Sequence, residues 1–178
     1  MKNFFALLIL LALPVSLSAQ GPAPAQIEEM KKLQFLIGQW QGTGWNEFVP
    51  GQRGTATITE TVQSKLDGTV LLFEGLGKAK IGAKGEEVVV HNALGVLSYD
   101  PRAKQFSLRS YLSDGRHVDA AAKFVGDAFE WGFEIPRMGT IRYNIKLTDK
   151  GEWFETGEMS QDGKTWRKIH EMTLRRVK

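Results

Sequence analysis

Cysteine is absent from the 178 residues of the chain. Without a thiol the protein cannot form disulfides, thiolate metal sites, a cysteine nucleophile or a lipid-modified N-terminal cysteine. Its stability must therefore come from a hydrophobic core. A domain of about 150 residues buries roughly two-thirds of its unfolded surface, so a single domain suffices for such a core.

A surplus of one charge is also lacking. The chain has 23 basic and 20 acidic residues, and the two signs interleave along its length. Nucleic-acid binding favours a clustered basic stripe with interspersed aromatic residues. The basic run at the C-terminal end, residues 175–178, is too short for one. The composition therefore predicts no nucleic-acid partner.

Long hydrophobic runs are confined to the start of the chain. Lys2 precedes an apolar run from Phe4 to Leu13, and small residues follow up to Ala19. This pattern is typical of a secretory signal and is too short to span a bilayer stably. We expect a signal peptide over 1–19, a flexible leader over 20–26 and one domain over 27–178. The predicted mature protein is exported, periplasmic or secreted, with no transmembrane segment.

Helical periodicity occurs in one short segment. Its apolar residues recur at helical spacing, and acidic residues precede basic ones, which suits the helix dipole. The apolar positions are Ile27, Met30, Leu33 and Leu36. This segment predicts a helix over 26–36, and nothing after Gly38 repeats its pattern.

The rest of the chain alternates with a period of two, as strands with one buried face do. Asp-Gly and related turn signals separate the alternating runs. The expected strands are 39–48, 54–66, 69–80, 86–99, 104–112, 116–125, 127–135, 139–148, 151–160 and 164–176. We predict an all-β fold of about ten antiparallel strands. Such a meander closes most simply into an up-and-down β-barrel, which leaves no exposed edge, and a two-sheet sandwich is the alternative.

Glycines surround a tryptophan where the first strand begins, in the pattern Gly38-x-Trp40-x-Gly42-x-Gly44. Glycine allows a strand to bend and a neighbouring backbone to approach closely. We interpret the motif as structural, with the Trp40 ring filling one end of the barrel.

This motif also carries a resemblance to known proteins. Gly38-x-Trp40 after a short helix resembles the calycin superfamily of lipocalins and fatty-acid-binding proteins. With Gly42 and Gly44 it is similar to the start of nitrobindin-like barrels, which have ten strands and hold haem b. Segments 94–100 and 166–174 resemble an uncharacterised bacterial family of barrel proteins, a domain of unknown function. The resemblance implies a calycin-like barrel and, through a histidine on the last strand, His170 as a haem ligand.

Several small or polar residues are expected to face the interior. A ten-stranded barrel is wider than an eight-stranded one, whose side chains fill the centre. Small inward residues would leave space for a ligand, and polar ones would orient it. The candidate ligand-binding residues are Asn92, Ser98, Ser110, Ala120, Tyr143, His170 and Met172. Thr57 and Thr59 are further expected inward positions, and alternation places Trp166 on the face of His170.

These observations predict an exported barrel that binds a small, largely apolar or amphipathic molecule and has no cofactor. One alternative is haem b bound through His170, with gas or peroxide chemistry. A second is an enzyme that uses Glu74 or Glu155 as acid or base. A third is an envelope interaction or structural protein without an internal ligand. Because no catalytic motif occurs, the sequence favours a binding protein over an enzyme.

Overall fold

The computed structural model describes residues 21, 23–83 and 85–177. The predicted signal peptide lies outside these residues. The helix α1 (Pro24–Lys31) begins within the stretch expected to be a leader, because proline suits the first helical turn. A 3-10 turn, η1 (Gln34–Leu36), follows it, so the predicted helix is two shorter elements. In the described part of the chain, no helix has the length and apolar character needed to cross a membrane.

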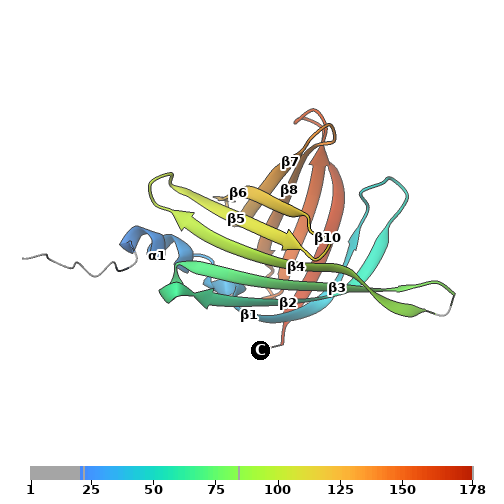
Figure 1. Cartoon of the computed structure of the whole chain (residues 1–178), viewed down its shortest axis with the longest axis horizontal. Helices are drawn as coiled ribbons and strands as arrows, with labels where there is room; N and C mark the ends of the chain where they lie inside the picture. The colour runs from blue at the N-terminus through green and yellow to red at the C-terminus, as the bar shows by residue number, and fades with distance from the viewer. Residues whose placement is uncertain (1–20, 22, 84, 178) are drawn as a thin grey trace, which may run out of the picture.

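Ten antiparallel strands follow and close into a barrel, which confirms the predicted fold and excludes the sandwich. Each strand pairs with the next in sequence, and β1 pairs with β10. Figure 1 shows α1 at one end of the strands and the hairpin of β3 and β4 extending beyond the others. The strands are β1 Gly38–Asn46, β2 Gly54–Lys65, β3 Val70–Ile81, β4 Glu86–Asp100, β5 Gln105–Leu112, β6 His117–Val125, β7 Ala128–Ile135, β8 Gly139–Leu147, β9 Trp153–Ser160 and β10 Arg167–Arg176.

The core fills the end of the barrel near α1. Trp40 is 1% exposed, and its indole Nε1 donates a hydrogen bond of 2.7 Å to the carbonyl oxygen of Leu36 in η1. Its ring meets that of Trp153 edge-on, at 5.8 Å between centroids. The guanidinium of Arg176 lies 4.1 Å from the centre of the Trp40 ring. The η1 turn, the two tryptophans and β10 therefore seal this end.

Glycines allow β1 to close against β10. Gly38 begins β1 with a φ of 138°, which only glycine adopts readily. A Cβ on Gly42 would overlap the carbonyl oxygen of Thr173 and lie 2.9 Å from the Cα of Leu174. A Cβ on Gly44 would lie 2.8 Å from the Cβ of Met172. The seam between the first and last strands thus has no room for side chains at positions 42 and 44 of β1.

Substitution of Gly42 by Ala is expected to lower the free energy of unfolding by about 1–3 kcal/mol, because the added methyl overlaps backbone atoms. Gly54→Ala is the matched control, since a Cβ on Gly54 in β2 would meet nothing within 4 Å. Urea unfolding of both variants measures the difference. Equal losses of stability would show that the seam is not tightly packed.

Candidate functional site

The two ends of the barrel interior differ in solvent exposure. Near α1 the interior is filled by the core, where Leu36 and Leu174 are 0% exposed. Toward the other end, Ser110, Tyr143 and His170 also face inward by strand register but keep accessible surface. An inward side chain can remain accessible only if solvent enters the barrel. Solvent therefore reaches part of the interior at the end away from α1, although Ile141 there is 1% exposed.

Strand register places five of the seven predicted ligand-binding residues on the inner face. They lie on β5, β6, β8 and β10, and they are Ser110, Ala120, Tyr143, His170 and Met172. Ala120 is almost fully buried by its neighbours, whereas Ser110 is partly accessible. Contact of any of them with a ligand stays a prediction.

Asn92 and Ser98 lie on the outer face, so their expected inward orientation is wrong. Both positions of the alternation in β4 carry apolar residues, and the pattern alone does not tell which face is buried. Packing determines which face of β4 is buried, because Leu97 pairs with Leu71 of β3 and is 1% exposed. The side chains on either side of Leu97 therefore point outward.

Three further residues that were expected inside also lie outside. Glu74 lies on the outer face of β3, because Phe73 beside it packs against the core. Thr57 and Thr59 point outward on β2, because Ile58 between them packs against the core. Glu74 and Glu155 therefore lie on opposite faces of the barrel wall and cannot act together as acid and base.

A β-bulge sets the orientation of His170. The pairing of β10 with β9 shifts between Lys168 and His170, and Ile169 in between is 0% exposed. Lys168 consequently points outward, where its Nζ lies 2.9 Å from a carboxylate oxygen of Glu171. Trp166 also lies outside, with the guanidinium of Arg142 at 3.8 Å from its ring centre. The expected sharing of one face by Trp166 and His170 is wrong, since simple alternation misses the extra residue.

Two carboxyl groups face the interior, and the sequence reasoning missed one of them. Glu155 of β9 is 6% exposed, and its Oε2 accepts a hydrogen bond of 3.1 Å from the indole Nε1 of Trp153. Glu60 of β2 leans over Gly75 of β3, where a Cβ would lie 2.6 Å from its Oε1. The signal for Glu60 was its place between Ile58 and Val62 in the period-two pattern.

Neither interior carboxyl has a basic partner. In residues 23–83 and 85–177, no lysine or arginine forms an ion pair with Glu60 or Glu155. Burial raises the pKa of Glu60 to about 7. Burial, and then the negative charge of Glu60, raise the pKa of Glu155 to about 8. Both groups therefore hold protons near neutral pH, unlike carboxyls in water.

An aromatic row stands beside these carboxyls. The ring of Tyr143 on β8 stacks on Trp131 of β7 at 4.3 Å and meets His170 of β10 edge-on at 5.7 Å. Gly157 of β9 makes room for this arrangement, because a Cβ there would lie 2.6 Å from Cε1 of Tyr143. Burial raises the pKa of the Tyr143 phenol, and the charge of Glu155 adds to the effect. The hydroxyl therefore stays protonated as a hydrogen-bond donor.

The imidazole of His170 is neutral at physiological pH. Burial lowers its pKa to about 4, opposed by a hydrogen bond with the Trp45 backbone, and the nearby His91 lowers it further. His91 itself faces inward from β4, and burial followed by the charge of Arg116 lowers its pKa. A neutral imidazole can accept a hydrogen bond or ligate a metal. No group of three or more potential metal ligands is found in the described part of the chain.

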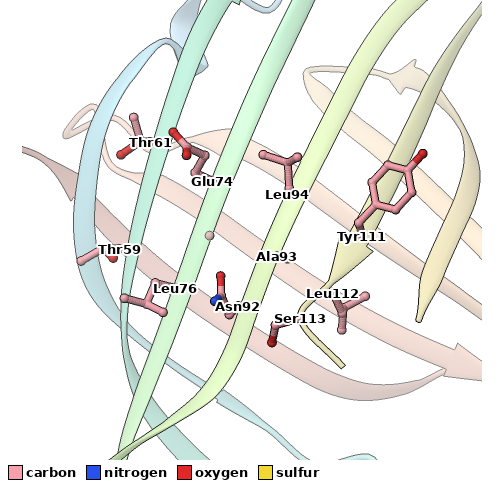
Figure 2. Close-up of a pocket in the computed structure, with 11 residues that line it drawn as sticks. Thr59, Thr61, Glu74, Leu76, Asn92, Ala93, Leu94, Tyr111, Leu112 and Ser113 are labelled. Atoms are coloured by element: carbon pink, nitrogen blue, oxygen red, sulfur yellow. The ribbon is translucent and has the colours of Figure 1, made fainter. Parts of the chain in front are cut away.

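A separate groove lies on the outside of the barrel wall. Its volume is about 660 Å³, and it crosses the outer face of β2, β3, β4 and β5. Figure 2 shows the side chains that line it, among them Glu74, Asn92 and Tyr111. The groove is wide and open to solvent, and these side chains are exposed. Since it holds none of the buried ionisable groups, we take the interior as the candidate site.

Comparison with solved structures finds a similar fold. The crystal structure of Rv2717c from M. tuberculosis matches 88% of this chain and 99% of its own, with a TM-score of 0.59 and 16% sequence identity. At that identity the likeness concerns the fold alone. No family model and no curated protein matches the chain.

The interior carboxyls predict how stability depends on pH. Because both bind protons more tightly in the folded than in the unfolded protein, the free energy of unfolding should fall as pH rises from the unfolded pKa of 4.5 through about 7 to 8. His170 acts in the opposite direction, but mainly below its unfolded pKa of 6.5. The slope is at most about 1.4 kcal/mol per pH unit for each proton held.

Urea unfolding at several pH values measures this slope. Glu155→Gln should flatten it, whereas Glu134→Gln, which changes an exposed carboxyl on β7, should not. A wild-type stability that is constant or rises from pH 7 to 8 would contradict the burial of two unpaired carboxyls.

Proposed function

We propose that the protein binds a small, largely apolar or amphipathic molecule inside the barrel, at the end away from α1. The observation that carries this proposal is the difference between the two ends. The inward side chains of Trp40, Trp153 and Leu174 near α1 are at most 2% exposed, whereas Ser110, Tyr143 and His170 keep accessible surface. Ligand sites are typically concave and mostly apolar, with a few polar groups that fix orientation.

The residues at the open end fit this description. The small inward residues Ala93 on β4 and Ser110 on β5 leave room along one wall. Met172 contributes an adaptable apolar surface on another wall. The hydroxyl of Tyr143 and the ring nitrogens of His170 can bind a polar group of the ligand.

The sequence features beyond the barrel are consistent with a role outside the cytoplasm. We propose that the protein is exported and acts in the periplasm or after secretion, on the basis of the basic and apolar N-terminal segment. The resemblance to lipocalins and fatty-acid-binding proteins supports an interior ligand, because barrels of that superfamily bind apolar molecules inside.

Binding of N-phenyl-1-naphthylamine, an uncharged apolar probe, tests the proposal. Wild-type protein should bind it saturably at one site, with a rise in fluorescence. Ser110→Trp should weaken binding about tenfold, or about 1.4 kcal/mol, because the ring occupies the open interior. Ser107→Trp is the matched control, since Ser107 is exposed on the outer face of the same strand.

Circular dichroism and thermal unfolding establish that both variants are folded. Equal affinity of the two variants, or the absence of saturable binding to the wild-type protein, would contradict an interior ligand site.

Haem b bound through His170 is a second candidate. The observation that favours it is a neutral imidazole on the inner face, partly accessible from the open end. A histidine in that state is the axial ligand that a haem iron requires. When bound, the group would supply gas or peroxide chemistry. His170 would hold the iron, and Tyr143 and Trp131 would contact the porphyrin from the adjoining wall.

Titration with hemin tests this candidate. A haem site predicts a sharp Soret band at one equivalent of hemin, and His170→Ala should abolish it because the axial ligand is lost. His117→Ala should leave it unchanged, since His117 is exposed on the outside of β6. A broad shoulder of equal size in the wild type and both variants would exclude His170 ligation.

A further inference from the structure

We infer that Glu60 and Glu155 together recognise a basic nitrogen, an amine or amidine, on an otherwise apolar ligand. This inference rests on the proposed interior binding function and names the class of ligand. Nothing in the resemblance to calycin or nitrobindin barrels implies such a group.

The two carboxyls lie on either side of the barrel seam. Glu60 stands on β2 and Glu155 on β9, and only β1 and β10 lie between these strands. Gly42 and Gly44 on β1 carry no side chains, and Leu174 and Met172 on β10, which pair with them, are the inward side chains between the carboxyls. Trp153, two residues before Glu155, meets the ring of Phe73 edge-on at 6.4 Å, and Glu60 leans over Gly75, two residues after Phe73, so both carboxyls face the same layer of the interior.

The walls supply few partners for these carboxyls. The indole of Trp153 donates a hydrogen bond to Glu155, and burial raises the pKa of Glu60 to about 7. Two carboxylates offer about eight acceptor positions between them. An enclosed negative charge without a countercharge is unfavourable, and a cation placed between the two groups relieves that cost.

The other ionisable groups that face this space provide no cation. Burial lowers the pKa of His170 on β10 to about 4, the pKa of His91 on β4 is also lowered, and Tyr143 from β8 remains an uncharged phenol. The ligand is therefore the available source of positive charge.

Two arginines near the interior donate their hydrogen bonds to backbone carbonyl oxygens. Arg176 donates hydrogen bonds to the carbonyl oxygens of Phe35 and Ile37 and covers the Trp40 ring. Arg167 donates to the carbonyl oxygens of Glu47 and Phe48. Neither guanidinium pairs with an interior carboxylate.

An amine fits this pair better than a metal ion does. A metal site built on carboxylates needs further oxygen ligands, and no group of three or more ligands is formed among the described residues. An ammonium group needs only hydrogen-bond acceptors, and its apolar chain can lie along the small residues of the opposite wall. The ligand class is thus an amphipathic amine with its charged end directed inward.

Binding of such a cation should depend on pH. The amine binds the ionised carboxylates, so it displaces the protons that the empty site holds near neutral pH. Affinity should therefore rise between pH 6 and 8, while the amine, with an ordinary pKa of about 10.4, stays charged. An uncharged ligand of the same length should bind equally well at both pH values.

Isothermal titration calorimetry with decylamine, decanol and decanoate tests the inference. At pH 8 decylamine should bind at least about tenfold more tightly than decanol, and this advantage should shrink at pH 6. Glu60→Gln and Glu155→Gln should each remove most of the advantage and leave decanol binding unchanged. Glu74→Gln is the matched control, because it alters a carboxyl in the outer groove.

The possible outcomes distinguish a failure of amine recognition from a failure of interior binding. Equal binding of amine and alcohol, or strongest binding of decanoate, would overturn amine recognition and leave interior binding intact. Loss of the amine preference in Glu74→Gln alone would place amine recognition in the outer groove and also overturn it. Failure of all three probes to bind would contradict the proposed function itself. If the interior variants do not fold, the wild-type protein alone tests the inference: decylamine must bind more tightly than decanol at pH 8, and by a smaller factor at pH 6.

Discussion

The close approach of β1 to β10 is the constraint on which the rest of the molecule depends. Gly42 has no space for a Cβ, and any side chain there would separate the first strand from the last. An open sheet would expose two strand edges and would have no interior. Closure instead brings Arg176 over the Trp40 ring and seals one end with the η1 turn.

Closure of the barrel also shifts the pKa values of the ionisable groups in its interior. A carboxyl on an open sheet would be hydrated, and its pKa would stay near that of a model peptide. In the closed barrel, Glu60 and Glu155 lose most of their water and retain protons near pH 7. The same burial keeps the imidazole of His170 neutral. Burial by the barrel wall, more than interaction among these groups, therefore sets their protonation states.

The fold could be predicted from sequence because alternation and turn residues act locally. Strands such as β8, with apolar Ile141 and Ile145 on one face and polar residues on the other, fix their own orientation. Strands β3 and β4 carry apolar residues on both faces, so only packing against Leu97 and its neighbours decides which side is inward. The site was therefore partly mispredicted, with Asn92 and Ser98 placed inside.

Two features of the site depend on contacts that local patterns do not encode. The bulge at Ile169 changes which residues of β10 share a face, and it appears only when β10 pairs with β9. The interior role of Glu60 follows from its position opposite Trp40 in the register of β1 with β2. In the sequence Glu60 looks like an ordinary polar residue on a half-buried strand.

The central claim is that the end of the barrel away from α1 admits a ligand while the end near α1 is sealed. The five tryptophans report on it directly, because each indole N–H gives its own signal in a nitrogen–proton correlation spectrum. Titration with decanol should shift the signal of Trp131, whose ring stacks on Tyr143, more than those of Trp40 and Trp153 at the sealed end. Those of Trp45 and Trp166, which lie on the outer face, should not move. Shifts confined to the outer tryptophans and to Tyr111 in the outer groove would contradict the account.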